Sequence, residues 1–318
     1  MAPGDAGLAH DYWKQYYTPD EVAEIVANRT TTMFVSGGYP IHVGLYLQPQ
    51  QAPTVLMAHG LYVYSLALAR LQLPFFRAGF NVVAWDLPGM GQSGGARGDC
   101  TLPEFIRAWQ DALEFTYRRF GAPIYSLGVA EDALTCYYAL ANNPNVQALS
   151  LHTLLEIGDF EGVHWVGPYW WTRLLVAGLR LGSLVRPSTS RPAQVLVPLE
   201  WIFTGPGDRR VIELLRGDPL GFNNVSLRMA AMLGVSRAAP VPFEACRTPV
   251  QVIASESNRI WRHPVVARNY ARLSGPKELV TLPGVGQWEY NREFHETYAA
   301  LVIRWFESQQ ASEQGQTS

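Results

Sequence analysis

The sequence predicts an α/β fold in which a parallel sheet is interrupted by an inserted, mostly helical segment. Strand-like runs alternate with helical stretches along most of the chain of 318 residues. Those runs are apolar throughout, which indicates strands buried on both faces of a parallel sheet. The alternation stops between about Glu156 and Glu244 and then resumes. We therefore predict four parts: a first core segment (1–155), a helical cap insertion (156–244), a second core segment (245–309) and a polar tail (310–318).

The individual elements follow from local signals. The first 18 residues are rich in aromatic side chains but irregular, and Thr18 and Pro19 then form a helix start, with Thr18 as the N-cap. Two short strand-like runs around Gly37-Gly38 predict a hairpin. The expected strands and helices then alternate: PTVLMAH, 65–78, FNVVAWD, 102–120, APIYSLG, 131–142 and VQALSLHT before the insertion, and TPVQVIAS, 264–273, KELVTLPG and 292–307 after it. The last residues are polar and without periodicity, which predicts a frayed end.

Composition excludes several classes of protein. Twenty-five basic and 27 acidic residues leave a formal charge of −2, so the broad positive field of a nucleic-acid binder is missing. Three cysteines without a CxxC pair indicate neither a disulfide framework nor a zinc site. No signal-peptide pattern opens the sequence and no apolar stretch approaches 18 residues, so we expect a cytoplasmic protein. Because no nucleotide-binding, HExxH or EF-hand motif occurs, we expect no cofactor and no metal.

Two glycine-containing motifs carry a family resemblance. His59-Gly60 follows a strand, and the stretch Asp86–Gly95 reads DLPGMGQSGG, with Arg97-Gly98 close behind. In this combination and spacing the chain resembles the α/β-hydrolase superfamily, and within it the monoacylglycerol-lipase/lysophospholipase-like branch, over roughly residues 30–307. The resemblance implies a mostly parallel eight-stranded sheet flanked by helices, with an inserted helical cap.

The resemblance also implies positions for a catalytic triad, and this sequence departs from the family at each of them. The elbow that carries the nucleophile, G-x-S-x-G in the family, reads GVAED from Gly128, so that Ala130 stands at the nucleophile position and Asp132 at the second glycine. The acid matches Asn258 in SESN, and the histidine matches Gln287 in PGVGQ. Without a hydroxyl no acyl-enzyme forms, and without an imidazole nothing transfers the proton. Replacements at three separated sites favour a natural lineage over an engineered variant.

Some chemistry could survive these replacements. In this fold the oxyanion hole consists of backbone N–H groups, here those of Glu131 and Leu61. Such a pair stabilises negative charge on a carbonyl oxygen, which supports enolate formation, retro-aldol cleavage, decarboxylation or isomerisation. His152, at the end of a strand, is either a replacement acid or base or a buried core histidine. Asn258 and Gln287 form either a neutral polar floor or a self-satisfied amide pair, and Asp132 is an alternative nucleophile.

Aromatic side chains around these positions predict an apolar pocket. We expect Tyr62 and Trp288 to form its walls, with His164 and Trp165 reaching it from the cap. His59 belongs to the oxyanion loop and either lines the pocket or only supports it. The apolar cap helix could instead contact a membrane surface.

Three functions fit this sequence. The first is a non-hydrolytic enzyme, of the cyclase, lyase or isomerase type, acting on a hydrophobic, carbonyl-bearing small molecule in natural-product metabolism. The second is a catalytically inactive ligand-binding protein, and the third is a lipase- or esterase-like hydrolase with an atypical or mutated triad. The sequence does not fix the oligomeric state.

Overall fold

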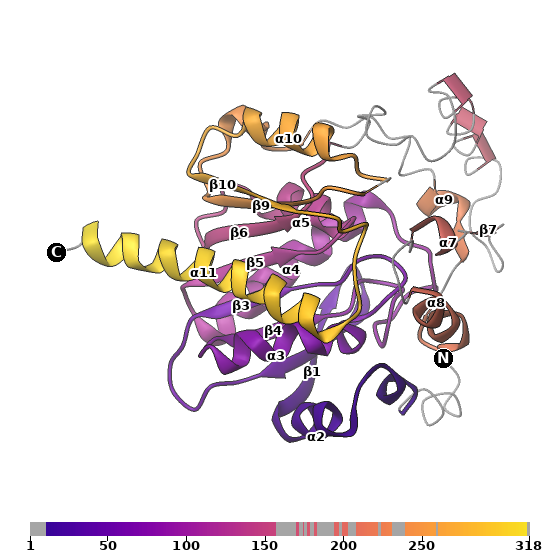
Figure 1. Cartoon of the computed structure of the whole chain (residues 1–318), viewed down its shortest axis with the longest axis horizontal. Coiled ribbons are helices and arrows are strands. Elements are labelled where there is room, and N and C mark those ends of the chain that lie inside the picture. Colours follow the sequence, from indigo (N-terminus) through magenta and orange to yellow (C-terminus); the bar gives the residue numbers. More distant parts are fainter. Residues whose placement is uncertain are drawn as a thin grey trace.

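The structure, a computed structural model, describes most of the predicted core and part of the predicted cap. The described residues are 11–156, 239–258 and 260–316, together with the following shorter stretches: 170–171, 174, 177–178, 181–182, 194–196, 199–202, 208–221 and 224–230. Figure 1 shows a central sheet with helices on both faces, and the labelled cap elements lie beyond the ends of the strands, on the right of the view.

An eight-stranded sheet forms the centre of the molecule, as the resemblance implied. Its strand order is β1-β2-β4-β3-β5-β6-β9-β10, and β2 is antiparallel to both of its neighbours whereas all the other pairs among β3 to β10 are parallel. The strands are β1 (Arg29–Ser36), β2 (Tyr39–Tyr46), β3 (Thr54–Met57), β4 (Asn81–Trp85), β5 (Ile124–Gly128), β6 (Val146–His152), β9 (Val250–Ser255) and β10 (Lys277–Leu282). Strands β3, β4, β5 and β9 are buried along their whole length, which explains why their sequences are mainly apolar.

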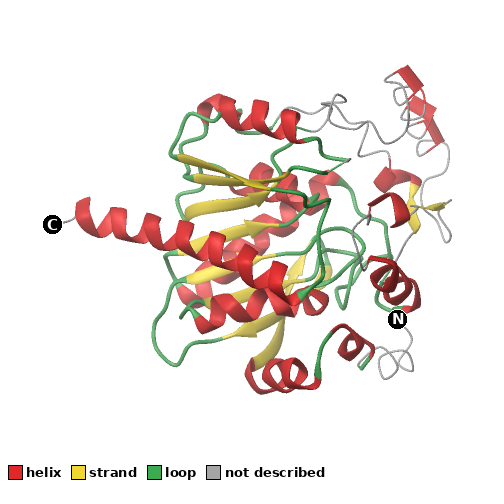
Figure 2. Cartoon of the chain, in the orientation of Figure 1, coloured by secondary structure: helices red, strands yellow, loops and turns green. Residues whose placement is uncertain are grey.

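Helices cover both faces of this sheet (Figure 2). Helix α3 packs against α11 on one face, and α4 packs against α5 on the other. The helices are α2 (Pro19–Asn28), α3 (Ala69–Arg77), α4 (Leu102–Phe120), α5 (Asp132–Leu140), α10 (His263–Arg272) and α11 (Arg292–Gln316). Within the described residues, no helix has both the length and the apolar character needed to cross a bilayer.

Local sequence signals set the helix ends. The Thr18 hydroxyl accepts from the backbone N–H of Glu21 while the Glu21 carboxylate accepts from the backbone N–H of Thr18, which is a capping box at the start of α2. Thr101 and Glu104 form the same device at the start of α4. Both starts were readable from the sequence.

Two terminal segments differ from the prediction. The segment before Thr18 contains a short 3-10 helix, η1 (Tyr12–Tyr16), whose Tyr16 hydroxyl donates to Asp218. Helix α11 was expected to end near residue 307 but continues to Gln316. A helix that is already nucleated by packing gains one hydrogen bond for each further residue, so polar residues without an apolar period can extend it.

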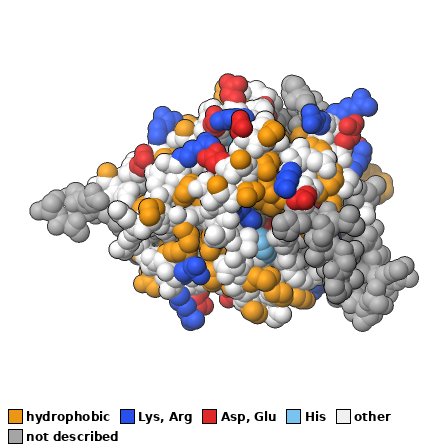
Figure 3. Space-filling model, turned by 90° about the horizontal axis from the view of Figure 1, so that it is seen from below, with side chains coloured by type: hydrophobic (Ala, Val, Ile, Leu, Met, Phe, Trp, Pro, Cys, Tyr) orange, Lys and Arg blue, Asp and Glu red, His pale blue; other side chains and the backbone are white. Residues whose placement is uncertain are grey.

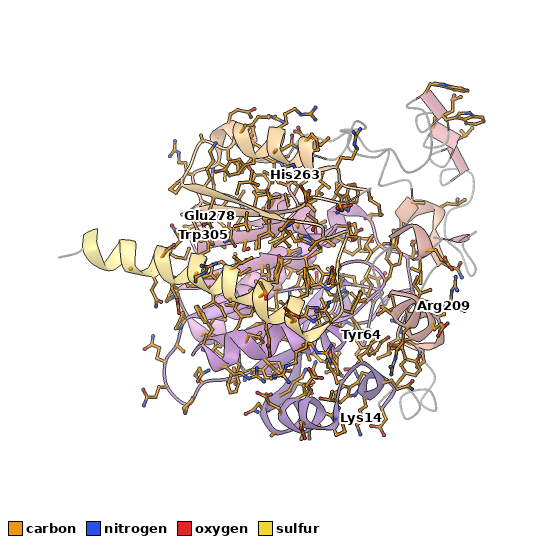
Figure 4. All side chains as sticks on the ribbon, viewed as in Figure 1. Lys14, Tyr64, Arg209, His263, Glu278 and Trp305 are labelled. Carbon is orange, nitrogen blue, oxygen red and sulfur yellow. The ribbon has the colours of Figure 1, made fainter. Side chains whose placement is uncertain are left out.

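The described part of the cap consists of short elements between β6 and β9. They are β7 (Gln194–Leu196), α7 (Leu199–Ile202), α8 (Asp208–Gly217), β8 (Asn224–Ser226) and α9 (Leu227–Ala230), and β7 pairs with β8 outside the main sheet. Tyr64 lies on the side of the core that faces α8 (Figure 4), and its hydroxyl donates to Asp218 just after that helix. The exact boundaries of core, cap and tail stay a prediction.

Charge is distributed evenly on the visible surface. In Figure 3 acidic and basic side chains are interspersed with apolar ones, and neither sign dominates that face. This agrees with the near-neutral composition of the chain.

Candidate active site

The candidate site lies where three neighbouring strands end. After β3 the chain continues to β4 on one side, whereas β5 lies on the other, so this edge is a topological switch point. Met57 on β3 is paired with Leu127 on β5, so the loops that follow these strands emerge side by side. The sheet topology therefore brings residues near 60 and residues near 130 together.

Strained backbone marks the same edge. Tyr62, Ala130 and Thr153 follow β3, β5 and β6, and they have φ values of 75°, 55° and 89°. L-residues rarely adopt these values, and such strain concentrates at functional sites. The Thr153 hydroxyl also donates to the carbonyl oxygen of Ala130 at 3.5 Å. Ala130 thus stands at the tip of a sharp turn between β5 and α5, where the sequence analysis placed it.

Close packing explains the residues on either side of this turn. A Cβ atom at Gly128 would lie 2.6 Å from the Cα of Ala133, so only glycine fits there. Asp132 is buried, and its Oδ1 accepts from the indole N–H of Trp109 at 2.8 Å and from the hydroxyl of Thr135 at 2.6 Å. The Asp132 side chain is therefore held by α4 and α5 and does not line the cavity described below.

Asn258 and Gln287 form a chain of hydrogen bonds with a fixed direction. The Oδ1 atom of Asn258 accepts from the backbone N–H groups of Ile260 and Trp261, at 3.0 and 2.9 Å. The Nδ2 atom of Asn258 then donates to Oε1 of Gln287 at 2.7 Å. This leaves the Gln287 NH2 group to donate to Oε1 of Glu131 at 3.3 Å. Because two backbone donors fix the first amide, the whole chain presents donors toward Glu131.

The carboxyl group of Glu131 lies beside the predicted oxyanion hole. The backbone N–H groups of Glu131 and Leu61, which the sequence analysis assigned to the hole, are close enough to stabilise the charged carboxylate and so act to lower its pKa. Its Oε2 atom also lies 3.5 Å from the position that a Cβ of Gly60 would take. Burial raises the pKa of Glu131, while these two N–H groups and the indole of Trp261 oppose that rise by stabilising the carboxylate.

These groups open onto a small cavity. It has a volume of about 20 Å³, and its walls come from the loops after β3, β5 and β10. The lining residues are Gly60, Leu61, Tyr62, Val63, Leu68, Val129, Ala130, Glu131, Gln287, Trp288 and Tyr290. These described residues include no lysine, arginine or histidine. Glu131 is the one carboxyl group among them.

His59 supports the site from behind and is not among the lining residues. It is fully buried, its Nδ1 lies 2.8 Å from the carbonyl oxygen of Gly60, and its Nε2 accepts from the backbone N–H of Leu87 at 3.1 Å. The ring therefore joins the loop after β3 to the DLPGMG loop, which holds the backbone of Leu61 in position.

His152 also lies outside the cavity wall. It is fully buried, its Nε2 lies 3.0 Å from the hydroxyl of Ser255, and its ring packs against Trp288 and Tyr298. Burial lowers the pKa of His152 to about 3, so the ring is neutral at physiological pH. This geometry favours the core-histidine interpretation of His152. His164 and Trp165, the two predicted cap contributors, lie outside the described residues.

Three contributors were not identified from the sequence. The Glu131 carboxylate was considered only as a group at a helix N-terminus, and it was not assigned to the cavity. Trp261 and Tyr290 were not identified either, although each follows a strand end, the position from which side chains reach the crevice of an open α/β sheet. The proximity of Glu131 to Gln287, 156 positions apart in sequence, depends on the sheet topology alone.

Comparisons with known proteins agree with this architecture. The sequence matches none of the curated proteins. Among solved structures, DcsB in complex with its substrate analogue superposes with a TM-score of 0.71 at 16% identity, covering 88% of this chain and 99% of that one. The monoacylglycerol lipase of Paleococcus ferrophilus gives 0.66 at 17% identity, with coverage of 88% and 99%. A thermostable carboxyl esterase from Bacillus coagulans, in complex with glycerol, gives 0.67 at 16% identity, with coverage of 88% and 98%.

At these identities the structural neighbours show the α/β-hydrolase fold alone. The model of one protein family, described as serine aminopeptidase, S33, matches residues 49–286, well over half of the sequence. That match contains the DLPGMG loop, the turn at Ala130 and Asn258, and it ends one residue before Gln287. The chain therefore belongs to the serine aminopeptidase S33 family of the α/β-hydrolase superfamily.

Proposed function

We propose that this protein is a non-hydrolytic enzyme of its family, acting on a hydrophobic, carbonyl-bearing small molecule. In this proposal Ala130, Asn258 and Gln287 occupy the positions of the nucleophile, the acid and the histidine. The observation that carries it is the turn at Ala130, which has a φ of 55° but presents a methyl group where an attacking atom would be needed. Cyclase, lyase and isomerase reactions need no such atom.

The character of the cavity supports this substrate class. Its walls are mainly aromatic and aliphatic, and its polar groups are an amide, a carboxyl and backbone N–H groups. Apolar pockets with a few placed polar groups suit small organic ligands, and paired N–H donors suit a carbonyl oxygen. DcsB was solved with a substrate analogue bound, and a small-molecule substrate is the natural expectation for this chain as well.

Two other functions remain as alternatives. A ligand-binding protein without catalytic activity is favoured by one observation: the Glu131 carboxyl lies at the cavity wall beside the two donors of the oxyanion hole, where a substrate oxygen would have to bind. A hydrolase would need another nucleophile. Asp132 is the alternative given by the sequence, and its Oδ1 is bound by Trp109 and Thr135.

A fluorophosphonate probe, which labels activated serine nucleophiles, separates a serine hydrolase from the other functions. We expect the wild-type protein to stay unlabelled. The triple variant Ala130→Ser, Asn258→Asp, Gln287→His should become labelled and should hydrolyse p-nitrophenyl butyrate, with a companion variant that adds Glu131→Ala to empty the hole. Labelling of the wild type would overturn the proposal. If both of these variants fold but show neither labelling nor hydrolysis, the three residues do not stand at the triad positions.

A further inference from the structure

Glu131 is a carboxyl group held in an unusual place. Gln287 donates to its Oε1 at 3.3 Å, and its Oε2 lies 3.5 Å from the position that a Cβ of Gly60 would take, beside the loop that carries the N–H of Leu61. The carboxyl lines the cavity next to the Ala130 methyl group. The Glu131 carboxyl, which could react, therefore lies beside the N–H groups of Leu61 and Glu131, which could bind a developing oxyanion.

The described residues that line the cavity provide no counter-cation for Glu131. Its charge acts on the neighbouring titratable groups of Tyr62 and Asp132. Burial raises the pKa of all three groups. A carboxyl whose pKa is raised above its usual range is a stronger base, which is the property required of a general acid–base catalyst.

We propose that the Glu131 side chain is the acid–base group of this cavity, and that it acts by exchanging places with the carbonyl oxygen of the substrate at the N–H groups of Leu61 and Glu131. The inference rests on the proposed function and names its substrate as a carbonyl compound with an acidic C–H bond beside the carbonyl. The absence of a cation among the lining residues favours an uncharged reacting end.

The proton transfer balances without any further reactant. The Glu131 carboxylate turns out of the hole and takes a proton from the carbon next to the carbonyl. The C–H electron pair becomes a C=C bond, and the carbonyl π pair moves onto oxygen, which binds the two vacated N–H groups. In a substrate with a further C=C bond beside the acidic carbon, the oxygen pair then re-forms the C=O bond, the double bonds shift along the chain, and the far carbon takes the proton back from the Glu131 carboxylic acid. The net change is an isomerisation, and Glu131 ends as the carboxylate.

A probe that needs only a desolvated base tests this role without the natural substrate. 5-Nitrobenzisoxazole is flat and apolar, and it opens when a base takes its ring C–H proton. The C–H pair then forms the nitrile, the N–O bond breaks, and its electron pair leaves on the phenolate oxygen of the coloured product, 2-cyano-4-nitrophenolate. Both the base and the oxyanion hole would contribute to this reaction.

We expect the wild-type protein to accelerate this ring opening, and Glu131→Gln to reduce the rate by about a hundredfold or more. Glu131→Asp, which keeps the carboxyl on a shorter side chain, should retain part of the rate. Glu289→Gln is the matched control, since Glu289 lines a neighbouring groove and not the cavity. The wild-type rate should rise with pH through an inflection above the usual carboxyl range. A Glu131→Gln rate equal to that of the wild type overturns the inference.

Binding of the product measures the second half of the inference. With the carboxyl removed, Glu131→Ala should bind 2-cyano-4-nitrophenolate more tightly than the wild type, because the two N–H groups become free. Equal or weaker binding by a variant with wild-type circular dichroism contradicts an occupied hole. Fluorophosphonate labelling of the wild type would overturn the proposed function itself. An unlabelled wild type with an unaffected Glu131→Gln would overturn only the role of Glu131.

Discussion

The side-chain amide of Asn258 donates to Oε1 of Gln287 across 2.7 Å, which joins the loop after β9 to the loop after β10. Both side chains are buried. Because Asn258 also accepts from two backbone N–H groups, its orientation is fixed, and it fixes the orientation of Gln287 in turn. The direction of this chain decides that Glu131 meets a donor and not an acceptor.

Replacing Asn258 tests the importance of that fixed amide. Asn258→Ala leaves the buried N–H groups of Ile260 and Trp261 without an acceptor, which should lower the free energy of unfolding by about 1–3 kcal/mol. Asn258→Asp keeps the acceptor for both groups and should cost less. Urea denaturation of the two variants beside the wild type measures the difference. Equal losses would mean that the two N–H groups do not depend on Oδ1.

The left-handed backbone at Ala130 predicts a stabilising substitution. Glycine adopts a φ of 55° without a Cβ penalty, so Ala130→Gly should raise the free energy of unfolding by up to about 1 kcal/mol. Ala133→Gly is the matched control, because Ala133 lies in α5, where glycine should cost about 1 kcal/mol. Chemical denaturation of both variants checks the opposite signs. A loss at both positions would show that the turn at Ala130 is not strained.

The buried Asp132 predicts a pH-dependent stability. Burial raises the pKa of Asp132 from 3.8 to about 7, and the charge of Glu131 acts in the same direction. The hydrogen bonds from Thr135 and Trp109 act to lower the pKa, because they stabilise the carboxylate. Between these values the unfolded chain is ionised while the folded side chain keeps its proton, so this group makes the protein less stable as the pH rises through that window. Asp132→Asn should remove this effect. Its free energy of unfolding should therefore rise relative to that of the wild type by up to about 4 kcal/mol between pH 4 and pH 8. Urea titrations at both pH values measure it, and a constant difference would contradict the prediction.

The buried His152 predicts the opposite pH dependence. Burial lowers the pKa of His152 from 6.5 to about 3, so between these values the unfolded chain binds a proton that the folded chain does not. The contribution of His152 to stability is therefore fully present above the pKa of the unfolded chain, and it is lost as the pH falls toward the pKa of the folded chain. Between pH 7.5 and pH 5 the wild type should lose about 2 kcal/mol more than His152→Gln. Parallel losses in denaturation experiments would show that His152 is accessible to protons in the folded state.

Most of the core could be predicted because its signals are local. The capping box of Thr18 and Glu21 fixes the start of α2, and the mainly apolar run of β9 indicates a strand buried on both faces. The extension of α11 to Gln316 was not predictable from periodicity, because those residues have no apolar stripe and depend on the packed turns before them.

The candidate site was predictable only in part. Motif spacing located Ala130, Asn258 and Gln287, and the structure places Ala130 at the sharp turn and joins the two amides. Motif spacing did not determine the position of His152, which could have faced the crevice or the core from the same strand end. Burial beside Trp288 and Tyr298 is a matter of tertiary packing, which no local pattern encodes.

The sequence alone determines which chemical groups are available: an alanine at the turn, two amides and a glutamate. Side-chain identity does not depend on folding. Where the glutamate's oxygens go was decided by the folded molecule alone. Leu61, Glu131 and Gln287 meet only after the sheet has set β3, β5 and β10 in its order, and hydrogen bonds act only over such short distances.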